Sequence, residues 1–132
     1  MRVIDSSVLV KYFSREDGWE IARKFIIDGG ITLDLALKEL GNALWKKSIK
    51  KEIEPETIIQ ILRDIINEKP IIIEPETRYL LEALKYAIKN KITIYDSLFI
   101  VLAKNKKLEL VTAVRRQAET AKKSGIKTIL IK

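Results

Sequence analysis

The chain has 132 residues, and 47% of them are hydrophobic, which is enough to build the core of one domain spanning residues 1–132. It contains neither cysteine nor histidine, which excludes disulfides, thiolate or imidazole metal sites and Ser-His-Asp triads. The formal charge of +7 favours a polyanionic partner such as nucleic acid, although a solubilising basic surface would give the same balance.

Apolar spacing and turn residues predict helices that alternate with short strands along the whole chain. Helices are expected at about residues 6–13, 18–27, 35–51, 56–67, 76–89, 96–105 and 114–123. Strands are expected at residues 2–5, 31–33, 108–112 and 127–131. The Ile-Ile-Ile segment at residues 71–73 is either a further strand or only a connection between helices.

Strands separated by helices imply a parallel sheet with right-handed crossovers and helices on both faces, which is an α/β fold. In such a sheet, ligands bind at the carboxyl ends of the strands. The helix that begins near Asp96 is apolar nearly all round between Leu98 and Ala103, so we expect it to be buried.

Three carboxylates stand out in this arrangement. Asp5 ends the first strand and Asp96 begins the buried helix, but each could equally be an ordinary N-cap. Glu39 is less ordinary, because its helix neighbours are mostly small or apolar and the only opposite charge, Lys46, is two turns away. Three carboxylates brought together repel one another unless a cation neutralises them, and Mg²⁺ or Mn²⁺ would do so.

Four segments resemble the motif blocks of the PIN domain family, in order and across nearly the whole chain. They are Val3-Ile4-Asp5-Ser6-Ser7, Leu37-Lys38-Glu39-Leu40-Gly41-Asn42-Ala43-Leu44, Tyr95-Asp96-Ser97-Leu98 and Leu110-Val111-Thr112-Ala113. The resemblance is closest to the short prokaryotic VapC toxins. It implies a three-layer α/β/α sandwich with a central parallel sheet of four or five short strands, and a metal-dependent ribonuclease.

Carried over by position, the resemblance makes Asp5, Glu39 and Asp96 the catalytic, metal-binding acids, with Mg²⁺ or Mn²⁺ as the cofactor. Thr112 matches a hydroxyl residue that supports the site. Ser6, beside Asp5, and Asn42, one helical turn from Glu39, are expected to support it too. The metal would activate a water molecule for attack on a phosphodiester, so the missing histidine is no obstacle.

One departure concerns the end of the last block. The family usually has a fourth acid two residues after the threonine, whereas this chain has Val114 there. A valine cannot bind a cation, so we expect weaker metal affinity, with water molecules completing an Mg²⁺ shell. Asp34 is the only nearby acid that could compensate, and we do not expect that it does.

Basic residues flank the predicted crevice. A lysine cluster within residues 46–51, which includes Lys46, ends the Glu39 helix, and Arg115 and Arg116 follow the strand that carries the threonine. We expect them to make salt-sensitive contacts with an RNA backbone, although the lysines could equally be a solvated helix end.

The resemblance also implies two protein partners, a second copy of the chain in a homodimer and an antitoxin whose peptide blocks the active-site groove. We expect a cytoplasmic protein without membrane contact. No apolar run reaches the roughly 18 residues that span a bilayer, and the first residues lack the layout of a signal peptide.

The first interpretation is therefore a metal-dependent endoribonuclease, the toxin of a type II toxin–antitoxin pair. The alternative is a PIN-fold RNA-binding or regulatory protein with weakened or lost nuclease activity, for which Val114 is the distinguishing feature. A phosphoacceptor receiver domain is a third interpretation, suggested by Asp5 and Thr112 after their strands. It lacks the expected acidic pair and an aspartate at the end of a middle strand.

Overall fold

The computed structural model describes residues 1–132 and contains five strands, seven α-helices and one 3-10 helix. The strands are β1 (Arg2–Ile4), β2 (Gly30–Leu33), β3 (Ile72–Glu74), β4 (Leu110–Thr112) and β5 (Thr128–Leu130). The helices are α1 (Ser6–Phe13), α2 (Trp19–Ile27), α3 (Leu35–Ile49), α4 (Pro55–Glu68), η1 (Glu76–Tyr79), α5 (Leu80–Asn90), α6 (Ile94–Lys106) and α7 (Arg115–Lys123).

All five strands form one parallel sheet in the order β3-β2-β1-β4-β5. The first strand therefore lies in the middle, between β2 and β4. The isoleucine segment is a strand and not a mere connection, because β3 pairs with β2 in register from Ile31 opposite Ile72 to Leu33 opposite Glu74. The predicted α/β fold with a parallel sheet is confirmed.

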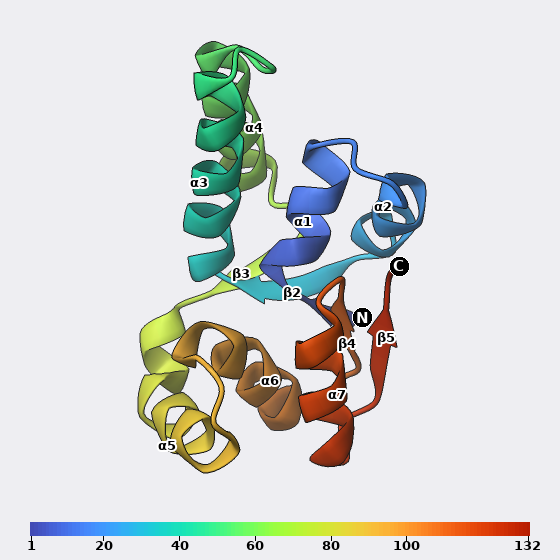
Figure 1. Ribbon diagram of the computed structural model, residues 1–132, viewed down its shortest axis with the longest axis vertical. Coiled ribbons are helices and arrows are strands. Elements are labelled where there is room, and N and C mark those ends of the chain that lie inside the picture. The colour runs from blue at the N-terminus through green and yellow to red at the C-terminus, as the bar shows by residue number, and fades with distance from the viewer.

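Helices cover both faces of the sheet and give the predicted α/β/α layers. Figure 1 shows α1, α2, α3 and α4 on one side of the strands and α5, α6 and α7 on the other. None of the helices combines the length and the apolar character that crossing a membrane requires.

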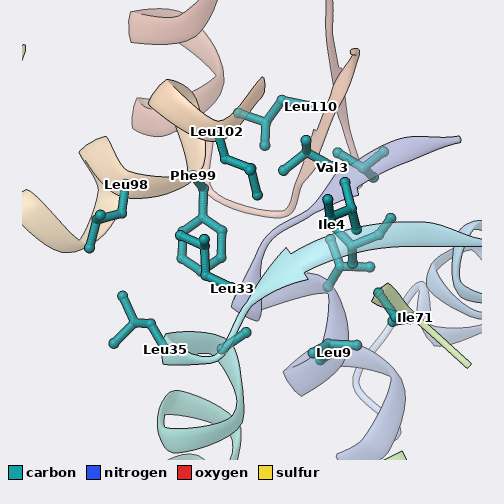
Figure 2. Packing of buried hydrophobic residues seen from close by; sticks show 14 of the residues in the cluster. Val3, Ile4, Leu9, Leu33, Leu35, Ile71, Leu98, Phe99, Leu102 and Leu110 are labelled. Carbon is teal, nitrogen blue, oxygen red and sulfur yellow. The ribbon is translucent and has the colours of Figure 1, made fainter. Parts of the chain in front are cut away.

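The core lies between the sheet and these two layers. Seven consecutive residues of α6, from Ser97 to Ala103, are buried, so the predicted burial of this helix is confirmed. Figure 2 shows Phe99 and Leu102 of α6 on one side of the strands and Leu9 of α1 on the other. Burying each such large side chain contributes about 1.5–3 kcal/mol, and this packing fixes where the ends of the strands and helices lie.

Two acids near the carboxyl ends of the strands, Asp96 and Asp34, do not use their side chains to cap the helices that begin beside them. Helix α6 begins at Ile94, because the Thr93 side chain caps it by accepting from the Asp96 N–H at 3.3 Å. Asp34 does not cap α3 with its side chain, and instead accepts from the Glu76 N–H at 2.9 Å. The Asp96 carboxylate is thus left free of a capping role, and Asp34 is occupied in joining β2 to the segment after β3.

Candidate active site

The site lies where β1 and β4 end side by side. The N–H of Asp5, the residue after β1, donates to the Val111 carbonyl of β4 at 3.2 Å. This pairing brings Asp5 next to Thr112, although 107 residues separate them in the chain. The parallel sheet therefore assembles two of the predicted site residues through main-chain hydrogen bonds alone.

The Asp5 carboxylate is almost completely buried and accepts hydrogen bonds on both oxygens. Oδ1 accepts from the Ser7 hydroxyl at 2.5 Å and from the N–H groups of Ser7 and Val8 at 3.0 and 3.4 Å. Oδ2 accepts from the Thr112 hydroxyl at 2.5 Å. The two readings of Asp5 are therefore compatible, since it caps α1 and also lies at the tip of the central strand.

Burial raises the pKa of Asp5 to about 6, against an ordinary value of 3.8. The hydrogen bonds from Ser7, Thr112 and Val8 lower the pKa but do not compensate for the lost solvation of the charge. A buried carboxylate with this cost of ionisation is stabilised by any nearby cation.

Glu39 lies on α3, which packs against α1. Its side chain is partly buried, and its Oε1 atom is buried without any hydrogen-bond partner. Burial raises the pKa of Glu39, the neighbouring Ser6 hydroxyl opposes this shift, and the charges of Asp5 and Asp96 raise the pKa further. Asp5 and Asp96 thus both lie close enough to Glu39 for their charges to act on it.

Asp96 lies in the first turn of α6 and is held by α7. Arg116 Nη2 lies 3.2 Å from Asp96 Oδ2, in an ion pair whose arginine is mostly exposed and whose aspartate is mostly shielded. The sequence predicted that Arg116 contacts RNA. It did not indicate that Arg116 pairs with Asp96. Arg115 lies elsewhere, in a second hollow beside Lys11 and the end of the chain.

A groove of about 780 Å³ opens at the site and runs between α1 and α3. Glu39 and Asn42 line it at the site, and Lys46 and Lys50 line it further along α3. Neither lysine has a carboxylate within salt-bridge distance, whereas Lys47, which also lines the groove, pairs with Glu52 at 3.6 Å. The groove therefore leads from Glu39 to two lysines at the end of α3 that have no carboxylate partner.

The supporting residues of the sequence prediction lie at the site but differ in their contacts. Thr112 contacts Asp5 directly, and Ser6 lies beside Glu39. Asn42 lines the groove without a hydrogen bond to Glu39, so its orienting role stays a prediction. Val114 lies next to the Thr112 hydroxyl, to which its N–H donates at 3.1 Å.

Two contacts of the site were missed by the sequence analysis. Ser7 donates to Asp5 and accepts from the Ala113 N–H at 2.9 Å, so it ties the start of α1 to the segment after β4. Gln117 is 2% exposed and lies between Thr112 and Asp96. Its position beside Ala118 and Ala121 on the buried face of α7 was a usable signal, because an amide is unusual on such a face.

The donor set has the chemistry of a site for a hard cation, because carboxylates and hydroxyls are the ligands that Mg²⁺ and Mn²⁺ prefer. The unpartnered, buried Glu39 Oε1 fits this reading, since such an atom is costly unless something binds it. As placed, however, the acids form no cluster of three ligands around one point. Asp96 is turned to Arg116, and the Asp5 oxygens face hydroxyl and N–H donors.

Comparisons with known proteins agree with the fold. A family model described as the PIN domain matches residues 2–123. The chain is 28% identical over 122 residues to Ribonuclease VapC3 of Pyrobaculum aerophilum, a match that covers 89% of this chain and 92% of that protein. It is 26% identical over 131 residues to Exonuclease VapC9 of the same organism, covering 98% and 93%.

Two solved structures are similar in fold. The crystal structure of PAE2754 from Pyrobaculum aerophilum aligns with a TM-score of 0.72 at 24% identity, over 96% of this chain and 82% of that one. A toxin–antitoxin complex from Klebsiella pneumoniae contains a chain that aligns with a TM-score of 0.64 at 15% identity, over 89% of each. At these identities the two structures support the fold alone.

Proposed function

Because the chain belongs to the PIN domain family, we propose that it is a metal-dependent endoribonuclease and the toxin of a type II toxin–antitoxin pair. Two relatives named as a ribonuclease and an exonuclease support nuclease chemistry, and the VapC names of both relatives support the toxin assignment. Family membership also decides against the receiver-domain interpretation.

The observation that carries the proposal is the buried, unpartnered Glu39 Oε1, which lies close enough to Asp5 and Asp96 for their charges to act on Glu39. Burial raises the pKa of Glu39, and so do the charges of Asp5 and Asp96. A divalent cation held by Asp5, Glu39 and Asp96 would relieve this repulsion. When bound, the ion would supply an activated water for in-line attack on a phosphodiester and would stabilise charge on the phosphate.

The protein's own groups would orient the acids. Ser7 and Thr112 fix the Asp5 carboxylate by donating to opposite oxygens, so its rotation is restricted before any ion arrives. Glu39 Oε1 has no competing partner and is available as a ligand. Asp96 becomes available once Arg116 turns from its carboxylate, which costs little because the arginine is mostly exposed.

Cleavage of a circular RNA tests the proposal, because only an endonuclease can open a circle. We expect Mg²⁺ or Mn²⁺ to support opening by the native chain, and Asp5→Asn, Glu39→Gln and Asp96→Asn to abolish it. Glu119→Gln is the matched control, because Glu119 is an exposed acid of α7 without an ion pair. Cleavage that survives the three substitutions would remove the metal-site assignment. Cleavage of linear RNA alone would point to exonuclease activity.

The groove supports an RNA strand as the substrate. Lys46 on α3 and Lys50 at its C-cap are four residues apart, so both ammonium groups can contact phosphates of a strand whose scissile bond lies at Glu39. Each phosphate contact to single-stranded nucleic acid contributes about 0.7 to the slope of log affinity against log salt concentration.

Removing both lysines as Lys46→Ala/Lys50→Ala should therefore weaken RNA binding and reduce that slope by about 1.4. Lys85→Ala/Lys89→Ala is the control, since these two lysines have the same spacing on α5 and no salt bridge. Binding measured by fluorescence anisotropy between 50 and 200 mM salt separates the two pairs. Equal losses in both would mean that the groove is not the binding path.

A PIN-fold RNA-binding protein with weakened nuclease activity remains the second candidate, and a specific observation favours it. Val114 stands where a fourth acid would bind metal, and the third acid is paired with Arg116. RNA binding that depends on Lys46 and Lys50, together with no opening of the circle at millimolar Mn²⁺, would establish this candidate.

The protein partners stay proposals. An antitoxin should be encoded by a small reading frame beside the gene, and its co-expression should suppress RNA cleavage by the native chain. A homodimer should have twice the mass of the 15.2 kDa chain in light scattering. Leu81 and Ile88 on α5 are strongly exposed apolar side chains that a second copy could cover.

A further inference from the structure

Gln117 is a buried polar side chain in a place where an apolar one would be ordinary. It is 2% exposed, and the other buried residues of α7 are Ala118 and Ala121. Taking an amide out of water costs free energy unless both its donor and its acceptor find partners. The contacts of Gln117 therefore indicate what this amide does in the fold.

Both ends of the amide face residues of the proposed site. Gln117 Nε2 donates to the Asp96 carbonyl at 3.0 Å, which fixes the amide orientation because a carbonyl only accepts. Gln117 Oε1 then lies 3.2 Å from the Thr112 hydroxyl, which also donates to Asp5 at 2.5 Å. A continuous chain of contacts thus joins Asp5 to Asp96 through Thr112 and Gln117.

Asp96 is held at three points, and two of them come from consecutive residues of α7. Thr93 accepts from its N–H, Gln117 donates to its carbonyl, and Arg116 pairs with its carboxylate. The arginine contact is exposed and weak, whereas the glutamine contact is shielded from water. The main-chain position of Asp96 relative to β4 therefore depends on Gln117.

We infer that Gln117 is a positioning residue that sets the separation between Asp5 and Asp96 and so prepares them to bind one divalent cation. The inference rests on the proposed function, because it takes these acids as the metal ligands. Val114 cannot supply a metal ligand to the site. The segment between Thr112 and Gln117 would instead contribute by holding Asp5 and Asp96 in place through hydrogen bonds.

The test compares Gln117→Met with Ser97→Ala by calorimetric titration with Mn²⁺. Methionine keeps the size and flexibility of glutamine but loses the hydrogen bond to the Asp96 carbonyl and the polar contact with the Thr112 hydroxyl. Ser97 is the matched control, because it is also buried and its hydroxyl donates to the Ala83 carbonyl at 2.6 Å, tying the same turn of α6 to α5 instead. Loss of a shell of hydrogen bonds around metal ligands typically weakens metal affinity about 10- to 100-fold.

We expect both variants to lower the thermal unfolding midpoint by a few degrees, and only Gln117→Met to weaken Mn²⁺ binding, by about tenfold or more. Gln117→Glu, which keeps the shape but cannot donate when ionised, should weaken it as well and covers the case in which Gln117→Met does not fold. In an Asp96→Asn background, Gln117→Met should have no further effect on Mn²⁺ affinity, because its effect acts through Asp96.

Three results would overturn the inference. Native-like Mn²⁺ affinity in both Gln117 variants would reduce the residue to a packing role, and so would an equal loss in Ser97→Ala. A full additional loss in the Asp96→Asn background would show that Gln117 acts elsewhere. If the native chain itself binds no Mn²⁺, the metal-site assignment fails, and this outcome is distinct from a failure of Gln117 alone.

Discussion

Replacing Asp5 by asparagine should stabilise the metal-free protein at neutral pH. The pKa of Asp5 rises from 3.8 to about 6 because the carboxyl is buried, so the folded state holds this proton more tightly than the unfolded state. Stability therefore falls as the pH rises from about 4 to about 6, and the loss persists above that range. Two pKa units at about 1.36 kcal/mol each correspond to roughly 3 kcal/mol.

Asparagine can satisfy the contacts that the carboxylate makes. Its carbonyl can accept from Ser7, and its amide can donate to the Thr112 hydroxyl, whose own proton is then free for Gln117 Oε1 at 3.2 Å. The substitution therefore removes the buried charge without leaving an unpaired group.

Urea unfolding of the native and Asp5→Asn chains, with a chelator at pH 4 to 8, measures the effect. We expect the variant to be more stable by about 2–3 kcal/mol at pH 7.5, and the difference to vanish near pH 4, where the native carboxyl is protonated. Added Mg²⁺ should stabilise the native chain and leave the variant unchanged. A variant that is less stable at pH 7.5, or a difference that does not change with pH, would refute the reasoning.

Three further substitutions address other contacts of the fold. Arg116→Ala should raise Mn²⁺ affinity about two- to fivefold by releasing Asp96, with Arg115→Ala unchanged in calorimetry; weaker binding would mean that Arg116 does not compete with the ion. Val114→Asp should raise Mn²⁺ affinity in the same assay, and no change would place that side chain away from the ion. Gly30→Ala should destabilise the fold by about 1–3 kcal/mol in urea, because its Cβ would lie 2.8 Å from a carbonyl oxygen of β1; native stability would show that the strands can separate.

The sequence was sufficient for the elements that depend on local pattern. Alternating helices and strands, the parallel sheet and the buried α6 follow from periodicity, and Asp5 at the tip of β1 follows from where the strand ends. The start of α6 can also be predicted from the sequence, because Thr93-Ile94-Tyr95-Asp96 fits the pattern in which a threonine caps a helix and an acid follows three residues later. Threonine and aspartate are both good caps, so residue type alone does not distinguish Thr93 from Asp96 as the cap.

Contacts between segments distant in the chain could not be read in the same way. The pairing of Arg116 with Asp96 depends on how α7 packs beside α6, and no spacing in the sequence encodes it. The burial of the unpartnered Glu39 oxygen likewise depends on how distant segments pack around α3, and no spacing in the sequence encodes it. Ser7 looked like an ordinary second residue of a helix, and only the sheet brings it to Ala113.

The central place of β1 in the sheet has a consequence for folding. Its two neighbours, β2 and β4, lie far apart in the chain, and the hydrogen bond from Thr112 to Asp5 closes a separation of 107 residues. During synthesis β1 must therefore wait, paired on one side at most, until β4 has been made. Such long-range pairing slows folding, and it also means that a nascent chain cannot assemble the acidic site before nearly all of it exists.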